Sequence, residues 1–292
     1  MSIKNELKKV LIPWKNWITV QSKHFFNTPK RVPQNSPEEI IASITSYPPR
    51  FGSLHLTLKS LTQQSQPANK ILLWIAHEDK ALVPKSVLKL EQQGLIEIHF
   101  TEDTKSYKKI IPALKGYPKA SIITFDDDVF YPSDALQKLI LLHKKHPNNV
   151  IANRTHIIKT DEAGHLSPYK QWRKNCSDPK HPDRNFQTGI GGVLYPPHSL
   201  HTNVMDQDLF TKLAPHGDDI WLYWTMRLNG NFAIKTDNDY KFYHWPFSQK
   251  TALYKRNVRT DGNDIQIDAM LKHFGSPLNV TESYPEEALK QG

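Results

Sequence analysis

The chain has 292 residues, of which 38% are hydrophobic and 23% are charged, and its formal net charge is +9. This composition is typical of a globular protein with a sizeable core, and it excludes a disordered or collagen-like chain. No apolar run approaches the ~20 residues of a membrane-spanning helix, and the first residues lack the apolar core of a signal peptide. The single cysteine, Cys176, excludes an intrachain disulfide. We therefore expect a soluble cytoplasmic protein, because reduced cysteines are usual in that compartment.

The excess positive charge is concentrated at the N-terminal end, where residues 1–35 contain seven lysines and arginines and one glutamate. Apolar side chains at helical spacing lie between these charges: Leu7, Val10, Leu11, Trp14, Trp17 and Ile18. Pro13 argues against one continuous helix. Cations beside tryptophans suit a peripheral contact with an anionic membrane surface, where each cation adds roughly 1 kcal/mol. A helix that packs on the main domain is the alternative, and no nucleic-acid partner is expected.

From residue 38 onward, short apolar runs alternate regularly with segments of helical spacing. Strands are predicted at 40–44, 71–75, 95–100 and 120–125, and helices at 52–64, 83–93, 107–114 and 133–145. Ser133 is the expected N-cap of the last of these helices. Repeated strand–helix units predict an α/β fold with a mostly parallel, doubly wound sheet. Ligands of such sheets bind beyond the carboxyl ends of the strands.

The regular alternation ends near residue 151. Residues 158–190 are polar and rich in proline, and we expect them to form substrate loops. Helices are predicted at 218–228 and near 265–274, with aromatic strands between them. The second half of the chain therefore has a mixed organisation.

Three consecutive aspartates, Asp126, Asp127 and Asp128, directly follow the predicted strand at 120–125. Like charges this close raise one another's pKa unless a cation neutralises them, and carboxylate oxygens select Mg²⁺ or Mn²⁺. In extended backbone Asp126 and Asp128 point to one side and Asp127 to the other. Two carboxylates can then serve the metal while the third turns toward a ribose or the backbone. A turn that caps the next helix is the alternative, which Ser133 at that helix's start disfavours.

A strand that ends in Asp-x-Asp after three strand–helix units resembles the nucleotide-diphospho-sugar glycosyltransferases of the GT-A fold. The resemblance covers roughly residues 38–275, and four further segments carry it: 46–50, 106–114, 191–197 and 218–221. These segments look like those of a bacterial branch related to the family-2 type transferases. The resemblance implies a GT-A-like (Rossmann-like) sheet with a mixed acceptor-side region. It also implies Mn²⁺- or Mg²⁺-dependent transfer of a sugar from a nucleotide-diphosphate donor to a glycan or lipid-linked acceptor, as in lipopolysaccharide or capsule synthesis.

The resemblance also suggests how the chain is divided. Residues 1–37 would form the basic N-terminal segment, 38–275 the catalytic domain and 276–292 a tail. Within the catalytic domain, about 38–155 would bind the nucleotide-sugar and about 156–275 the acceptor. Basic residues and tryptophans in the first segment favour a position on the inner face of the cell membrane.

Asp218 and Asp219 stand where inverting transferases of this kind carry an acidic pair. Attack by an acceptor hydroxyl on the anomeric carbon needs a general base within hydrogen-bond reach. Asp218 is also a plausible N-cap of the predicted helix at 218–228, so Asp219 would then be the base. The choice between the two carboxylates stays open.

The remaining expected site residues bind the donor or the metal. Arg50 and Lys108 offer positive charge to a diphosphate, although either alone can be a solvated surface residue. The resemblance adds Thr45, Ser46 and Tyr47 at the base and ribose, Asp126 and Asp127 at the nucleotide, Gly191 and Gly192 at the donor sugar, and His244 beside Asp126 and Asp128 at the metal. A tight turn is the alternative for the glycines, and a packed or surface side chain is the alternative for His244.

Two departures from the family pattern matter. The acidic pair usual after the second strand is not clearly present, and Glu78-Asp79 comes closest. The processive-synthase signature Gln-x-x-Arg-Trp is missing from the sequence, which favours transfer of a single sugar. A sugar nucleotidyltransferase or a metal-dependent phosphohydrolase would use the same aspartate–metal chemistry, and a non-catalytic basic binding module is the other alternative.

Overall fold

The computed structural model describes residues 11–15, 18, 20, 38–238, 240–245 and 262–279 of the chain. Its first half alternates strands and helices: β1 (Ile40–Thr45), α2 (Phe51–Thr62), β2 (Lys70–Ala76), α3 (Lys85–Gln92), β3 (Glu97–Thr101), α4 (Ile111–Gly116), β4 (Ser121–Phe125) and α5 (Ala135–Lys145). Three 3-10 turns follow the first three strands: η1 (Pro48–Arg50), η2 (His77–Leu82) and η3 (Lys105–Lys109). The predicted order of elements in this half is confirmed.

The second half contains shorter elements. They are β5 (Val150–Ala152), β6 (Thr155–Ile157), η4 (Tyr169–Gln171), β7 (Arg173–Lys174), η5 (Pro182–Arg184), β8 (Asn185–Gln187), η6 (Gly189–Gly191), β9 (Val193–Tyr195), η7 (Thr202–Met205), α6 (Gln207–Leu213), α7 (Asp218–Leu228), β10 (Ala233–Lys235) and α9 (Gly262–Phe274). The helix predicted at 218–228 has the same bounds in the structure as in the prediction. The prediction of loops for 158–190 is partly wrong, because β7 and β8 pair with β6 in a small antiparallel sheet.

The central sheet has seven strands in the order β10-β5-β9-β4-β1-β2-β3. β1 lies between β4 and β2 and pairs in parallel with both, with Ile41 opposite Lys70 and Ile122. Its apolar run is buried along nearly its whole length, as expected of a strand covered on both faces. β9 is antiparallel to β4 and β5, so the sheet is mixed at this point but parallel elsewhere. The mostly parallel α/β architecture is therefore confirmed.

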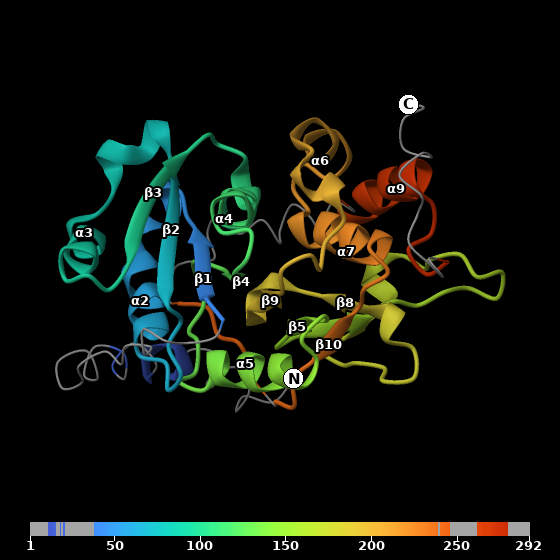
Figure 1. Cartoon of the computed structure of the whole chain (residues 1–292), viewed down its shortest axis with the longest axis horizontal. Coiled ribbons are helices and arrows are strands. Elements are labelled where there is room, and N and C mark those ends of the chain that lie inside the picture. Colours follow the sequence, from blue (N-terminus) through green and yellow to red (C-terminus); the bar gives the residue numbers. More distant parts are fainter. Residues whose placement is uncertain are drawn as a thin grey trace.

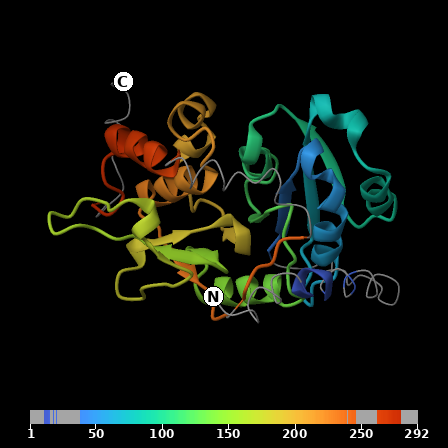
Figure 2. The ribbon, with the colours of Figure 1, turned by 180° about the vertical axis from the view of Figure 1, so that it is seen from behind.

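Alternate residues of the central strands face two separate cores. Ile41, Leu72 and Ile122 belong to the core on the face covered by α4, α7 and α9. Ala42 and Leu73 belong to the core on the opposite face, under α2, α3 and α5. Figures 1 and 2 show β1 to β3 with α2 and α3 in one half of the molecule, and α6, α7 and α9 in the other. Successive residues face opposite cores and both faces are buried, so each of these strands is a continuous apolar run in the sequence.

Two local predictions need correction. Ser133 is not the N-cap of α5: the cap position is Asp134, whose side chain makes no capping hydrogen bond. The Ser133 carbonyl instead accepts the amide of Ser65, which holds the residue in the preceding turn. The helix predicted at 107–114 begins only at Ile111, after η3. Pro112 lies in its first turn, where a backbone amide has no partner within the helix, so proline breaks no hydrogen bond there.

Little of the N-terminal segment falls within the described residues. Leu11, Trp14 and Ile18 are exposed, whereas Val20 is buried against Leu56 and Trp245. Part of the segment therefore lies on the main domain. The other apolar positions of the predicted stripe lie outside the described residues. Within the described part of the chain, no helix combines the length and hydropathy needed to span a bilayer.

Candidate functional site

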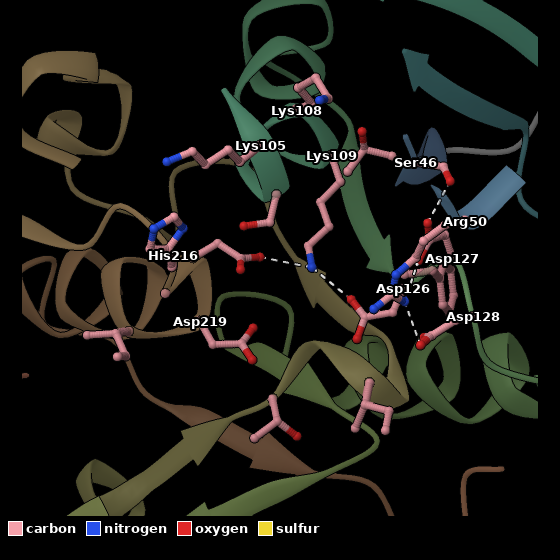
Figure 3. Close-up of a pocket in the computed structure, with 18 of the residues that line it drawn as sticks. Ser46, Arg50, Lys105, Lys108, Lys109, Asp126, Asp127, Asp128, His216 and Asp219 are labelled. Atoms are coloured by element: carbon pink, nitrogen blue, oxygen red, sulfur yellow. Dashed lines mark hydrogen bonds and ion pairs between the residues drawn. The ribbon is translucent and has the colours of Figure 1, made fainter. Parts of the chain in front are cut away.

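A cavity of about 860 Å³ lies beyond the carboxyl ends of β1 and β4, with walls from both halves of the molecule (Figure 3). This is the edge at which parallel α/β sheets bind ligands. The expected site residues that line it are Thr45, Ser46, Tyr47, Arg50, Lys108, Asp126, Asp127, Asp128, Asp218, Asp219 and His244. The structure thus brings together residues that are far apart in the sequence.

The first charged cluster joins Arg50 of η1 to Asp127 and Asp128. Arg50 Nη1 lies 3.0 Å from Asp127 Oδ1 and 2.5 Å from Asp128 Oδ2. The Ser46 hydroxyl donates to the second oxygen of Asp127 at 2.6 Å. Burial raises the pKa of Asp127 and Asp128 adds to this, whereas Arg50 and Ser46 oppose it. The guanidinium therefore supplies the cation that buried neighbouring carboxylates require.

The backbone of the aspartate loop is held from two sides. The Thr57 hydroxyl of α2 donates to the carbonyls of Asp127 and Val129 at 2.9 and 3.0 Å, and Trp245 Nε1 donates to that hydroxyl at 2.7 Å. The Trp245 amide also donates to the Asp128 carbonyl at 3.0 Å. These bonds bring the late aromatic segment to the end of β4 and place His244 at the aspartates.

His244 lies beside Asp128, as the resemblance implied. Its Nδ1 atom is 3.2 Å from Asp128 Oδ2, a close contact that is not aligned as a hydrogen bond. Nδ1 is buried and has no hydrogen-bond partner among the described residues. A carboxylate oxygen and an imidazole nitrogen thus converge, which is a ligand pair that suits Mn²⁺.

No larger metal-binding group accompanies this pair. Across the described ranges, no set of three or more histidine, cysteine, aspartate or glutamate side chains is arranged to hold an ion. Asp126, the third expected ligand, is turned toward Lys109. A two-residue set still fits a catalytic cation, because Mg²⁺ is usually held by one or two carboxylates together with substrate phosphates.

The second charged cluster surrounds Lys109, at the centre of Figure 3. Its ammonium lies 2.9 Å from Asp126 Oδ1 and 2.9 Å from Asp218 Oδ2, and its side chain is 6% exposed. Burial alone would lower the pKa of Lys109, but Asp126, Asp218 and Asp219 keep it well above its usual range. One lysine therefore links the end of β4 to the start of α7.

Asp219 points into the same region. Both of its carboxylate oxygens accept the amide of Gly189 at 3.1 Å. Burial raises the pKa of Asp219 to about 7, and Asp218 adds to this while Lys109 and Gly189 oppose it. An aspartate with this pKa can accept a proton near neutral pH, which a solvated aspartate does poorly.

Asp218 does not cap α7, which corrects the proposed division of roles. The N-cap is Gly217, and Asp218 is the first helical residue, without a side-chain capping bond at that end. Its carboxylate faces Lys109 instead. Both acids still gain from the partial positive charge of the helix N-terminus.

The sequence predicts Lys108 at the diphosphate and does not single out its neighbour Lys109. Lys108 is buried and lines the cavity, but its ammonium pairs with Asp103. The inward-facing Lys109 was missed, although adjacent lysines in a largely apolar segment were a signal that one of them is buried. Lys105, Arg154 and His216 line the cavity as well and were also missed.

Among the three glycines of this segment, Gly189 lies against the charged side chains of the cavity, although it does not line the cavity itself. A methyl group on Gly189 would lie 3.2 Å from Asp126 Oδ1, from Asp219 Oδ1 and from Lys109 Nζ. Gly191 and Gly192 are not among the lining residues. Gly192 has φ +87 and packs so closely on Phe125 that a Cβ would lie 2.5 Å from that ring. A role for these two glycines at the donor sugar stays a prediction.

Comparison with known proteins shows which solved structures share this fold. No family model and no curated protein matches the sequence. Among solved structures, a mannosyltransferase from Pyrobaculum calidifontis in complex with GDP-Man and Mn²⁺ aligns with 92% of this chain and 72% of its own, at a TM-score of 0.50 and 11% identity. The chain has a GT-A-like fold.

Two other solved structures align more weakly. S. aureus TarS 1–349 covers 84% of this chain and 67% of its own at 12% identity, with a TM-score of 0.47. The 4-diphosphocytidyl-2C-methyl-D-erythritol synthase from Anaerococcus prevotii covers 78% and 96% at 14% identity, with a TM-score of 0.45.

Proposed function

We propose that this chain is a metal-dependent glycosyltransferase that moves one sugar from a nucleotide-diphosphate donor to a glycan or lipid-linked acceptor, with inversion. The observation that carries the proposal is the meeting of Asp126–Asp128 with Asp218 and Asp219 in one cavity at the carboxyl edge of the sheet. The GT-A-like fold, shared with a mannosyltransferase solved with GDP-Man and Mn²⁺, supports it.

In this proposal, Asp128 and His244 hold the cation. Mn²⁺ or Mg²⁺ bound there would act as a Lewis acid on the donor's diphosphate and favour its departure. Asp127 would not be a ligand, because Ser46 and Arg50 occupy its two oxygens. Arg50 and Ser46, which follow β1, would bind the diphosphate and the ribose.

Asp219 is the better general base of the acidic pair. The Asp218 carboxylate is engaged by the Lys109 ammonium at 2.9 Å, whereas burial raises the pKa of Asp219. Asp219 would take the proton of the acceptor hydroxyl while the oxygen of that hydroxyl bonds to the anomeric carbon. The bond from that carbon to the diphosphate oxygen breaks at the same time, and the diphosphate leaves with the electron pair.

Gly189 lies between Asp126, on the proposed donor side of the cavity, and Asp219, on the proposed acceptor side. Asp126 and Asp219 approach it from opposite elements, and only a residue without a side chain leaves room between them. The acceptor, a bacterial surface polysaccharide role and a membrane-surface position rest on the family resemblance and the basic N-terminal segment.

The first test is thermal stabilisation by UDP, GDP, CDP and ADP, each with and without Mn²⁺. Wild type should be stabilised by one nucleotide in a Mn²⁺-dependent way, and Asp128→Asn should lose that shift. Asp208→Asn, an exposed aspartate on α6, is the matched control and should behave as wild type. The matching nucleotide-sugars would then be tested as donors. Absence of any shift in wild type would refute the proposal, and pyrophosphate release from a nucleoside triphosphate would favour a nucleotidyltransferase.

A further inference from the structure

Arg50 occupies the carboxylate that the proposed metal needs. Its Nη1 lies 2.5 Å from Asp128 Oδ2, and His244 Nδ1 approaches the same oxygen at 3.2 Å. A divalent cation binds carboxylate oxygen at about 2.0–2.2 Å, so on this oxygen it would lie in repulsive contact with a guanidinium that is only 2.5 Å away. The two cations therefore compete for one position.

The Arg50 side chain is only partly satisfied where it lies. It is 9% exposed, yet its Nε is buried without a hydrogen-bond partner among the described residues. A guanidinium offers five N–H donors in a planar fork, and a buried donor left unpaired is costly. Arg50 is thus held by its charge pairs with Asp127 and Asp128 and by a side-chain hydrogen bond with Tyr47, while its Nε donor stays unused.

The need for a cation at this point is electrostatic. Asp127 and Asp128 are adjacent and buried, and two carboxylates so close repel each other unless a cation lies between them. Arg50 supplies that charge from within the chain. The neighbouring Lys109 cannot replace it, because its ammonium is engaged by Asp126 and Asp218.

We propose that Arg50 is an internal counter-ion that a divalent cation displaces from Asp128, and that its guanidinium then turns to the donor's diphosphate. This inference rests on the proposed function. Asp127 would remain bound to Arg50 through the exchange, since Arg50 holds one of its oxygens and Ser46 holds the other. The N–H group of Nη1 released from Asp128 would donate to a phosphate oxygen, which accepts guanidinium donors strongly.

The test measures Mn²⁺ binding by the full chain without nucleotide, from the electron paramagnetic resonance signal of free Mn²⁺. Arg50→Gln should bind Mn²⁺ about tenfold or more tightly than wild type, because the competitor is removed. Arg50→Lys keeps the charge but loses the fork, and its affinity should lie between the two. Lys108→Gln is the matched control: it removes a buried cation of the same cavity that pairs with Asp103, so its Mn²⁺ affinity should stay near that of wild type.

A second measurement should move in the opposite direction. With saturating Mn²⁺, Arg50→Gln should bind whichever of UDP, GDP, CDP and ADP stabilises wild type about tenfold more weakly than wild type does, because the variant has no guanidinium to reach the diphosphate. Thermal unfolding without metal checks the fold of each variant. If Arg50→Gln does not fold, Arg50→Lys decides by the same two measurements.

The outcomes separate this inference from the proposed function. Equal Mn²⁺ affinity in wild type and Arg50→Gln, or an equal gain in Lys108→Gln, would overturn the displacement. In either case a Mn²⁺-dependent nucleotide shift in wild type would leave the transferase proposal standing. Tighter Mn²⁺ binding in Arg50→Gln alone supports the inference, including the case in which wild type binds no Mn²⁺ without nucleotide.

Discussion

The two charged clusters of the cavity are built differently. The Arg50 cluster lies within the first half of the molecule, between the ends of two adjacent parallel strands. The Lys109 cluster joins the two halves, because Asp126 follows β4 and Asp218 begins α7. Both place one buried cation between two carboxylates, but only the Arg50 cluster includes the histidine that suits a metal. The first cluster is therefore suited to exchange its cation, and the second to hold the donor and acceptor sides together.

The largest effect is expected at the acidic end of the Lys109 cluster. Asp219→Asn removes the proposed base and should lower the transfer rate by about 10²–10⁴-fold, with the fold retained. Asp218→Asn is the paired variant and should lose only about tenfold, because Asp218 positions Lys109 and does not accept the proton. Rates with the donor found in the nucleotide screen provide the measurement. A greater loss in Asp218→Asn would reverse the assignment of the base.

Replacement of Lys109 should show how strongly the fold depends on the Lys109 cluster. Lys109→Met leaves Asp126, Asp218 and Asp219 buried without their cation, and should lower the free energy of unfolding in urea by about 3–5 kcal/mol. Lys108→Met should lose about 1–2 kcal/mol, since water reaches its partner Asp103. The double variant Lys109→Met with Asp218→Asn should recover part of the loss. Equal losses at the two lysines would mean that the Lys109 cluster does not join the halves.

The raised pKa of Asp219 gives a pH dependence with opposite signs for activity and stability. A base must be ionised, so kcat/KM should rise with pH and level off above about 7. The folded protein keeps a proton that the unfolded carboxyl, with a pKa of about 3.9, has already lost. This contribution to stability is complete below that unfolded pKa and is lost as pH rises through the folded one.

Urea unfolding of wild type and Asp219→Asn between pH 4 and 7.5 isolates this contribution, because the amide does not titrate. The variant should gain stability relative to wild type as the pH rises through this range. A constant difference would show that Asp219 has an ordinary pKa and would weaken its assignment as the base.

The smallest effects compare two glycines. Gly189→Ala puts a methyl group 3.2 Å from three charged atoms of the Lys109 cluster, and should lower activity by about three- to tenfold with about 1 kcal/mol lost in stability. Gly52→Ala lies on the exposed side of α2 with no atom within 4 Å, and should gain about 0.5–1 kcal/mol. Thermal unfolding and rate measurements on both variants separate crowding at the site from the general effect of glycine.

The sequence alone determined the first half of the fold and the position of the site. Long apolar runs such as 71–75 can only be buried strands when helical segments alternate with them, and these signals are local. The aspartates after β4 were found from the strand that precedes them, and the acidic pair at the start of α7 was found from the family resemblance. The strands of three residues, β5, β9 and β10, were not found, because so short a run has no period and is stabilised by partners distant in sequence.

Only the tertiary structure decided which charged side chains meet. The 3-10 turn η3 directs Lys109 into the acids and Lys108 toward Asp103, although the two lysines are neighbours of one residue type. The pairing of Val129 with His244 brings a late histidine to the aspartate loop. Charge pairing depends on distances of a few ångströms between elements far apart in sequence, and no local pattern encodes such distances.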